Sequence, residues 1–445
     1  MATEHFSPEQ LTERFTFDSR FRNIAFGLIG IGLVLVLAGV FFSGQGGDDH
    51  SAAEHASAVT ESLAHPVADT HGHGHHEPTV GKRVLSNLLI CSMYFITICM
   101  GAFFFLAVHR VGNAGWQTAI RRVPEAIISY LPIGAVGFGA IFFFLGNLFE
   151  WSDPSIAVGQ DPLIDMKRAY LNDGFFIIRN VIYFGIWGGI AWYLRKLSIE
   201  QDSSSDGLAQ FNRSGVISAV FIILFAISYC LFAVDWVKSL EPHWFSTIFG
   251  IYIFGGSMKS AMVVIFLLLV FLQSQGYMKF VNNAHFHDVG KYAFGFTVFW
   301  AYIWIAQYLL IWYSNIPEEG IYYVKRYRTE DHTYLGYAFF FYSNIVINFI
   351  IPFLALMTRN AKRAAVAFVP VAVLMLYGHW HDLFLMVMPG AMGYNPGIGL
   401  IEVGMFVGFA GIFIYTVLTA LTKANLVPLK HPYLEESLHH STGPV

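Results

Sequence analysis

Ten long apolar runs constrain the fold of this chain more than any other feature of its sequence. They lie near residues 24–42, 84–108, 126–149, 175–194, 215–235, 246–272, 292–313, 336–357, 364–388 and 398–421. A helix of roughly 20 apolar residues crosses the hydrocarbon layer of a bilayer, where every backbone polar group must be bonded internally. Composition agrees, because charged residues make up 13% of the 445, about half the share in soluble domains. The sequence therefore predicts an all-α, polytopic membrane protein with about ten transmembrane helices.

The distribution of basic residues predicts the orientation. If the N-terminus lies inside, 16 of the 26 Lys and Arg residues fall on the cytoplasmic side and 8 on the other, while Arg179 and Lys259 fall within spans. Since Lys and Arg accumulate in cytoplasmic loops, both termini are predicted to be cytoplasmic. The resulting segments are a cytoplasmic stretch at 1–23, a first transmembrane helix at 24–42 that is retained as an anchor, a periplasmic loop at 43–83 and a cytoplasmic tail at 422–445.

The loop at 43–83 is the one long polar segment, and it contains the run His71-Gly72-His73-Gly74-His75-His76. A histidine-rich tract can bind a divalent metal. A solvated loop without a fixed scaffold would have the same composition, so we assign no metal site to it.

Cysteine and charge content limit the cofactors and partners. The three cysteines, Cys91, Cys99 and Cys230, all lie in apolar runs and form no Cys-x-x-Cys pair. The thiolate spacing of an iron–sulfur cluster is therefore missing, and no histidines at matching depth on facing helices suggest a haem. The chain alone is expected to bind no metal, haem or iron–sulfur cluster. A net charge of −4 without a long basic run argues against a nucleic-acid partner.

Polar residues gather near the predicted outer ends of several spans. Acid–Trp pairs close the third and fifth spans, an arginine lies just inside the fourth, and a histidine precedes the sixth; the set is Glu150, Trp151, Asp153, Arg179, Asp235, Trp236 and His243. Acids and an arginine at one depth between aromatic walls could bind a quinol head group and take up its protons. An aromatic belt with ion pairs in the loops is the competing interpretation.

Ionisable residues within the spans form a second set of candidates. A charge at the bilayer centre costs about 2.5 kcal/mol or more, so each one needs a physical reason. The candidates for a proton path are Lys259, His379, His381, Asp382 and Glu402. His379 and Asp382 are three residues apart and so share a helix face, and histidine titrates near neutral pH. Structural ion pairs and hydrogen bonds would explain the same residues.

Several longer runs carry a family resemblance. They are Phe149-Glu150-Trp151-Ser152-Asp153-Pro154, Asp235-Trp236 with Glu241 to Thr247, Gly250-Ile251-Tyr252, His285-Phe286-His287-Asp288, Phe299 to Glu319, Asp382 to Gly390, and Pro432 to Ser437. Together they resemble the second NrfD-like (polysulfide-reductase-type) membrane subunit of bacterial alternative complex III, a quinol:cytochrome c oxidoreductase. The resemblance covers most of the chain after the first span, apart from the His-rich loop.

The resemblance implies two four-helix bundles, at 84–235 and 246–388, flanked by the first span and by a tenth at 398–421. It also implies a place in the bacterial inner membrane. The partners would be an NrfD-like paralogue, an iron–sulfur subunit and cytochrome c subunits, which would hold the haem c groups and iron–sulfur clusters. This chain would then contribute to quinol interaction, to proton conduction, or to both, without being catalytic alone. A secondary transporter and a purely structural scaffold are the rival interpretations.

Overall fold

The computed structural model describes residues 11–45, 79–205, 207–327, 336–393 and 397–442. The predicted His-rich tract lies outside these residues. In the described part, ten helical spans are long and apolar enough to cross a membrane, and there is no strand. The prediction of an all-α protein with ten transmembrane helices is therefore confirmed.

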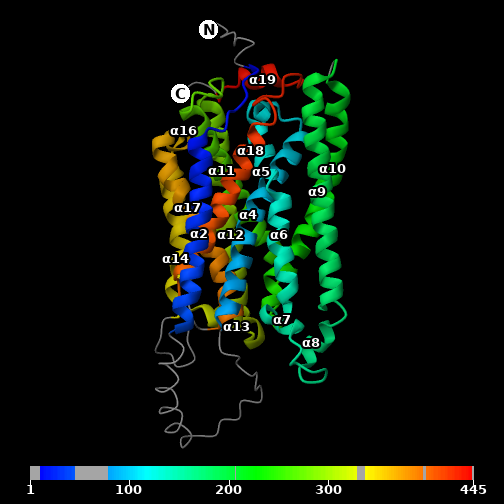
Figure 1. Ribbon diagram of the computed structural model, residues 1–445, viewed down its shortest axis with the longest axis vertical. Helices are drawn as coiled ribbons and strands as arrows, with labels where there is room; N and C mark the ends of the chain where they lie inside the picture. Colours follow the sequence, from blue (N-terminus) through cyan, green and yellow to red (C-terminus); the bar gives the residue numbers. More distant parts are fainter. Residues whose placement is uncertain (1–10, 46–78, 206, 328–335, 394–396, 443–445) are drawn as a thin grey trace, which may run out of the picture.

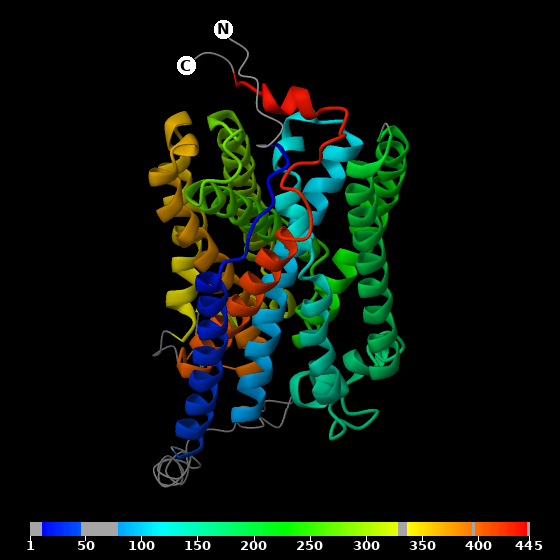
Figure 2. The same ribbon diagram turned by 45° about the horizontal axis from the view of Figure 1, so that its top comes forward.

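Six of the spans are single long helices in the first and central parts of the chain. They are α2 (Ser19–Gln45), α4 (Val80–Val111), α9 (Asp173–Ser203), α10 (Leu208–Trp236), α11 (Phe249–Ser274) and α12 (Asn283–Ser314). Two more, α17 (Ala365–Met392) and α18 (Leu400–Leu421), close the set of unbroken helices. In Figures 1 and 2, α9 and α10 form one side of the molecule and α17 lies on the opposite side.

The third and eighth spans are interrupted. The third consists of α5 (Arg122–Ile128), α6 (Leu131–Ile141) and α7 (Leu145–Leu148). The eighth passes from α14 (Ala338–Ile345) through a π-helical turn at Val346–Ile350 into α15 (Ile351–Leu356). Proline lacks an N–H and collides with the preceding turn of a regular helix, so Pro352 gives a reason for the wider turn. Such π-turns occur frequently at functional sites.

Burial separates central helices from those that face lipid. In the most apolar part of α4, 89% of the residues are buried, and in α11 the share is 78%, whereas in α2 it is 17%. The central pair packs closely, because a Cβ at Gly101 of α4 would lie 2.5 Å from the Ser257 carbonyl oxygen of α11. Small residues at such crossings let backbones approach when lipid supplies no hydrophobic drive between helices.

The first and tenth spans pack against each other. A Cβ at Gly32 of α2 would lie 2.4 Å from the Gly408 nitrogen of α18, and one at Gly404 would lie 2.8 Å from the Val36 nitrogen. Glycine at these positions is therefore a condition of the contact. The pair forms through tertiary packing between the first and last spans of the described chain.

Both ends of the described chain lie at the same end of the bundle (Figure 1). The Leu426 amide donates to the Glu13 carbonyl oxygen at 3.0 Å. The short helix α19 (Leu434–Leu438) packs on the turn at Gly115–Ile120, where the Ala119 amide donates to the Ser437 hydroxyl at 2.9 Å. The structure thus agrees with an even number of spans, while the cytoplasmic assignment of this end stays a prediction.

Candidate functional site

A buried polar network in the second half of the chain surrounds Asp382, on α17. Its carboxylate accepts hydrogen bonds from the Tyr252 hydroxyl, from the Trp300 indole nitrogen at 3.0 Å and from the Asn344 amide at 2.8 Å. These donors belong to α11, α12 and α14, so one carboxylate connects four helices of this half. A buried charge is tolerated where such hydrogen bonds replace its hydration.

The network continues to Lys259, which is fully buried near the middle of α11. The Asn348 amide donates to the Asn344 side-chain oxygen at 2.6 Å, and the Lys259 ammonium donates to the Asn348 side-chain oxygen. The ammonium also lies 4.7 Å from the centre of the Trp300 ring, whose electron-rich face attracts a cation. Asn348 belongs to the π-turn, which therefore presents a ligand to the buried lysine.

The two histidines of α17 do not pair with Asp382. The His379 Nε2 atom lies 2.9 Å from the Thr97 hydroxyl of α4, while His381 Nε2 lies 2.8 Å from the Phe340 carbonyl oxygen. His379 Nδ1 makes no hydrogen bond to any residue that the structure describes. The shared helix face expected for His379 and Asp382 thus does not produce an imidazole–carboxylate bond, because the two side chains have different neighbours.

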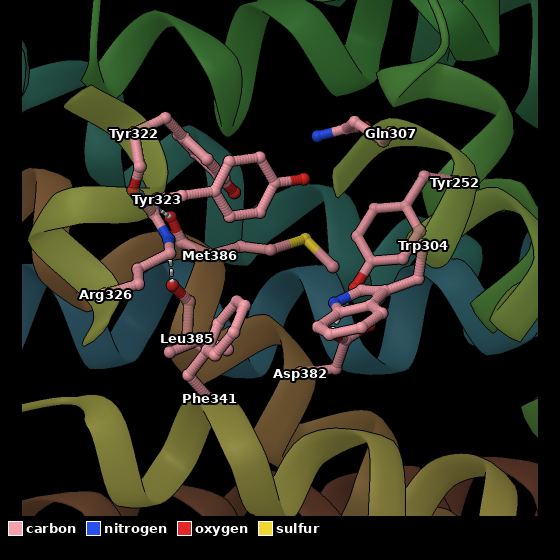
Figure 3. Close-up of a pocket in the computed structure, with 10 residues that line it drawn as sticks. All are labelled: Tyr252, Trp304, Gln307, Tyr322, Tyr323, Arg326, Phe341, Asp382, Leu385 and Met386. Carbon is pink, nitrogen blue, oxygen red and sulfur yellow. Dashed lines mark hydrogen bonds between the residues drawn. The ribbon is translucent and has the colours of Figure 1, made fainter. Parts of the chain in front are cut away.

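A small cavity lies beside Asp382, between α12, α14, α17 and the short helix α13 (Pro317–Tyr327) (Figure 3). It offers about 20 Å³ to water, enough for one molecule. Tyr252, Gln307 and Arg326 contribute polar groups to its wall, and the Met386 side chain extends across it.

An ion pair lies at the wall of this cavity. The buried Arg326 guanidinium of α13 donates to the Glu241 carboxylate at 2.8 Å and to the Leu385 carbonyl oxygen at 3.0 Å. Burial by itself would lower the pKa of Arg326, but the adjacent Glu241 carboxylate more than compensates, and the pKa is raised above its ordinary value. Arg326 also stacks on the Tyr322 ring, with 3.4 Å between the guanidinium carbon and the ring centre.

The predicted outer set in the first half of the chain is partly brought together. Arg179 of α9 donates two hydrogen bonds to Asp235 of α10, at 3.2 and 3.0 Å, and one to the Tyr170 carbonyl oxygen at 2.8 Å. Trp236 donates to Asn180 on α9. Bidentate pairing to a fully buried carboxylate occupies most of the guanidinium, which favours a structural role for this pair.

The remaining members of that set lie in different surroundings. The Trp151 ring packs on Phe176 of α9, with 5.1 Å between the ring centres. Glu150 is exposed. Asp153 accepts a bond from the Ser155 amide at 2.8 Å, as turn residues do.

His243 belongs to another pair, because its Nε2 atom lies 2.5 Å from the Asp161 carboxylate. Burial would raise the pKa of Asp161, but hydrogen bonds from the Ile164 amide and from His243 outweigh it and lower the pKa. Arg179 and His243 therefore pair with different carboxylates.

Glu402 has partners other than the α17 cluster with which the sequence grouped it. It accepts two bonds from Arg83 of α4, both at 2.8 Å, and one from Asn87 at 2.8 Å. The backbone amide of Gly399, which precedes α18, also donates to the Glu402 carboxylate at 2.7 Å, and this bond caps the start of α18. This geometry ties the tenth span to α4 and favours a structural role.

Sequence reasoning missed three groups that contribute to the site, Asn344, Asn348 and Arg326. A signal for the asparagines was present, since two amides four residues apart share a helix face in a span. Arg326 lies in a polar segment, where an arginine has no sequence-level reason to be buried. Sequence reasoning also missed Glu125, which forms ion pairs with three arginines in the first half of the chain.

These observations define a class of protein. The fold is that of a multi-pass α-helical membrane protein with ten candidate spans and buried ionisable groups in its second half. Among the described residues, no group of three His, Cys, Asp or Glu side chains is placed to hold a metal ion.

Comparison with known proteins adds no closer assignment. No family model matches the chain, and no curated protein matches it above the level of chance.

Proposed function

We propose that this chain is an integral membrane subunit of a respiratory quinol:cytochrome c oxidoreductase, and that its second half contributes to proton conduction. The sequence runs quoted above support the assignment to such a complex. The observation that carries the proton role is the buried polar series from the cavity at Arg326, through Asp382 and the two asparagines, to Lys259.

Two side chains in this series can change protonation, Asp382 and Lys259. The asparagine amides between them hold their oxygen and nitrogen atoms in fixed positions and do not titrate. Because a buried carboxylate and a buried ammonium interact strongly at low dielectric, a proton gained by one changes the cost of charging the other. A proton that enters from the cavity can therefore reach Asp382 first and alter the state of Lys259.

The series reaches mid-membrane from one side. Lys259 is ten residues from the start of the 26-residue α11. Thr97 and His379, which bond to each other, supply polar groups near this depth. Passage across the whole membrane would use water that enters between these helices when side chains move.

A quinol role has weaker support in the second half of the chain. Aromatic rings from Tyr322 and Trp304 line the cavity, as walls of a quinol site would. Its 20 Å³ is far below the roughly 300 Å³ of small-ligand pockets. A head group could enter only after Met386, which has a flexible side chain, moved out of the space.

The experiment is proton translocation by the purified complex in vesicles. Asp382→Asn and Lys259→Met should each lower the number of protons moved per electron while quinol oxidation continues. Glu318→Gln removes an exposed carboxylate from α13 on the same side and should leave the ratio unchanged. If both buried variants assemble and keep the wild-type ratio, the proton role is wrong. If they slow quinol oxidation while the remaining turnover keeps the wild-type ratio, the quinol role gains.

A further inference from the structure

A second, larger hollow opens at the end of the molecule where the described termini lie. Its volume is about 510 Å³, and it lies between the start of α12, the short helix α16 (Arg359–Arg363) and the tail segment His440–Thr442. Phe294 forms its apolar floor. A hollow of this size is within the usual range for small organic ligands.

The hollow contains more positive than negative charge. The cations on its wall are Lys291, Arg359 and Lys362, and the acid is Asp288. Asp288 is already paired, with Lys291 at 2.6 Å and with His440 at 2.6 Å. Arg359 forms no ion pair with any residue in the described ranges, and Lys362 donates only to the Leu356 and Met357 carbonyl oxygens. Two cations at the hollow thus lack a carboxylate partner in this part of the chain.

Lys362 is buried for a structural reason. A Cβ at Gly290 of α12 would lie 2.9 Å from the Lys362 carbonyl oxygen, so the glycine lets α16 approach. The Lys362 ammonium lies 4.7 Å from the centre of the Phe294 ring. Burial lowers the pKa of Lys362. His287 is also buried on the wall, and its Nδ1 atom lies 3.7 Å from the Asp288 carboxylate.

Depth and surroundings indicate the kind of anion. The 32 residues of α12 span roughly 48 Å, against a hydrocarbon layer of about 30 Å. The charged residues of α12, Asp288 and Lys291, lie near its start, so we place these first turns in the headgroup layer. The hollow adjoins these turns. Apolar side chains exposed below it, Val298 on α12 and Leu354 and Met357 at the end of the eighth span, can lie along acyl chains. Basic pockets between helices at this depth suit anionic lipid head groups.

We propose that this hollow binds the phosphate of an anionic phospholipid, with Arg359 and Lys362 as its cationic ligands. The phosphate would lie against these two cations, and the acyl chains would descend past Phe294 and Val298. The same phosphate chemistry is present in a soluble phosphate ester or in inorganic phosphate. The apolar surface below the hollow favours the lipid.

The test is lipid binding by the purified chain in mild detergent, measured as lipid adducts in native mass spectrometry. Phosphatidylglycerol should bind in preference to phosphatidylcholine with the same acyl chains. Arg359→Gln should weaken phosphatidylglycerol binding about fivefold, the usual effect of one cation near an anionic lipid surface. Arg213→Gln is the matched control, because Arg213 is an exposed arginine near the start of α10, outside the hollow. It should leave binding unchanged.

A competition experiment identifies the source of the phosphate, and a pair of Lys362 variants tests whether a loss of binding reflects misfolding. Excess inorganic phosphate should not displace the lipid; if it does so as well as excess phosphatidylglycerol, the lipid assignment is wrong. Lys362→Arg keeps the charge and should keep binding, whereas Lys362→Met should lose it. Equal binding by Arg359→Gln and wild type, or equal losses in Arg359→Gln and Arg213→Gln, would overturn the proposal.

Discussion

Glu125 offers the sharpest test of how buried charge stabilises this protein. It lies in α5 with 7% of its surface exposed. Its carboxylate accepts from Arg121 at 3.0 Å, Arg122 at 3.3 Å, Arg195 at 2.7 Å and the Ser198 hydroxyl at 2.6 Å. One anion therefore holds three cations, and it connects α5 to α9.

Glu125→Gln keeps the size of the side chain and removes the charge. The new amide nitrogen is a donor that faces guanidinium donors, and only Arg122 retains a carboxylate partner, Asp202 at 2.7 Å. Removing one partner of a buried ion pair costs about 3–5 kcal/mol, chiefly because the remaining charge is uncompensated. We expect a loss of stability in this range, measured as the free energy of unfolding in detergent.

Two comparisons distinguish the effect of uncompensated guanidinium charge from a general effect of mutation. Glu200→Gln breaks a half-exposed pair with Lys196, 3.7 Å apart, and should cost less than about 1 kcal/mol. Adding Arg195→Gln to Glu125→Gln removes one surplus cation and should recover part of the loss, as a double-mutant cycle would show. A loss below about 1 kcal/mol for Glu125→Gln, or no recovery in the double variant, would refute the reasoning.

Three other predictions follow from the structure. Burial, together with Arg121, lowers the pKa of His431 to about 3. Because this histidine binds a proton below about pH 6.5 in the unfolded chain but not in the folded one, the free energy of unfolding should fall by about 2 kcal/mol between pH 7 and pH 5. His431→Gln should reduce this pH dependence in unfolding measurements. Gly32→Val should separate α2 from α18 and lower thermal stability in detergent, whereas Gly27→Val, with open space around its Cβ position, should not; equal effects would contradict the packing argument. If the termini are cytoplasmic, a thiol at Val158→Cys, exposed at the other end, should react with an impermeant reagent only from the periplasmic side, and reaction only from the cytoplasm would reverse the orientation.

Local sequence was sufficient for the architecture of the spans. Hydropathy summed over about 20 residues places a helix in a bilayer whatever its neighbours are, so all ten spans could be predicted. Most ends were a few residues off, but α9 extends to Ser203 beyond the expected 194, and α12 begins at Asn283 before the expected 292, because polar turns continue these helices past their apolar runs. The first helix, expected at 24–42, extends over Ser19–Gln45. The rarity of charge in such segments also marked Arg179, Lys259, Asp382 and Glu402 as residues that need partners.

Partner identity depended on the tertiary structure alone. Each residue turns the direction of a side chain by about 100° around a helix, so a pair can be inferred only when the rotation and depth of both helices are known. The sequence grouped Glu402 with Asp382, but packing of α18 on α4 gives it Arg83. The sequence placed His379 beside Asp382, yet their directions differ by roughly 60°, enough to send one to Thr97 and the other to Asn344. Charge within a span is thus a property of the sequence, whereas the bond that stabilises it belongs to the fold.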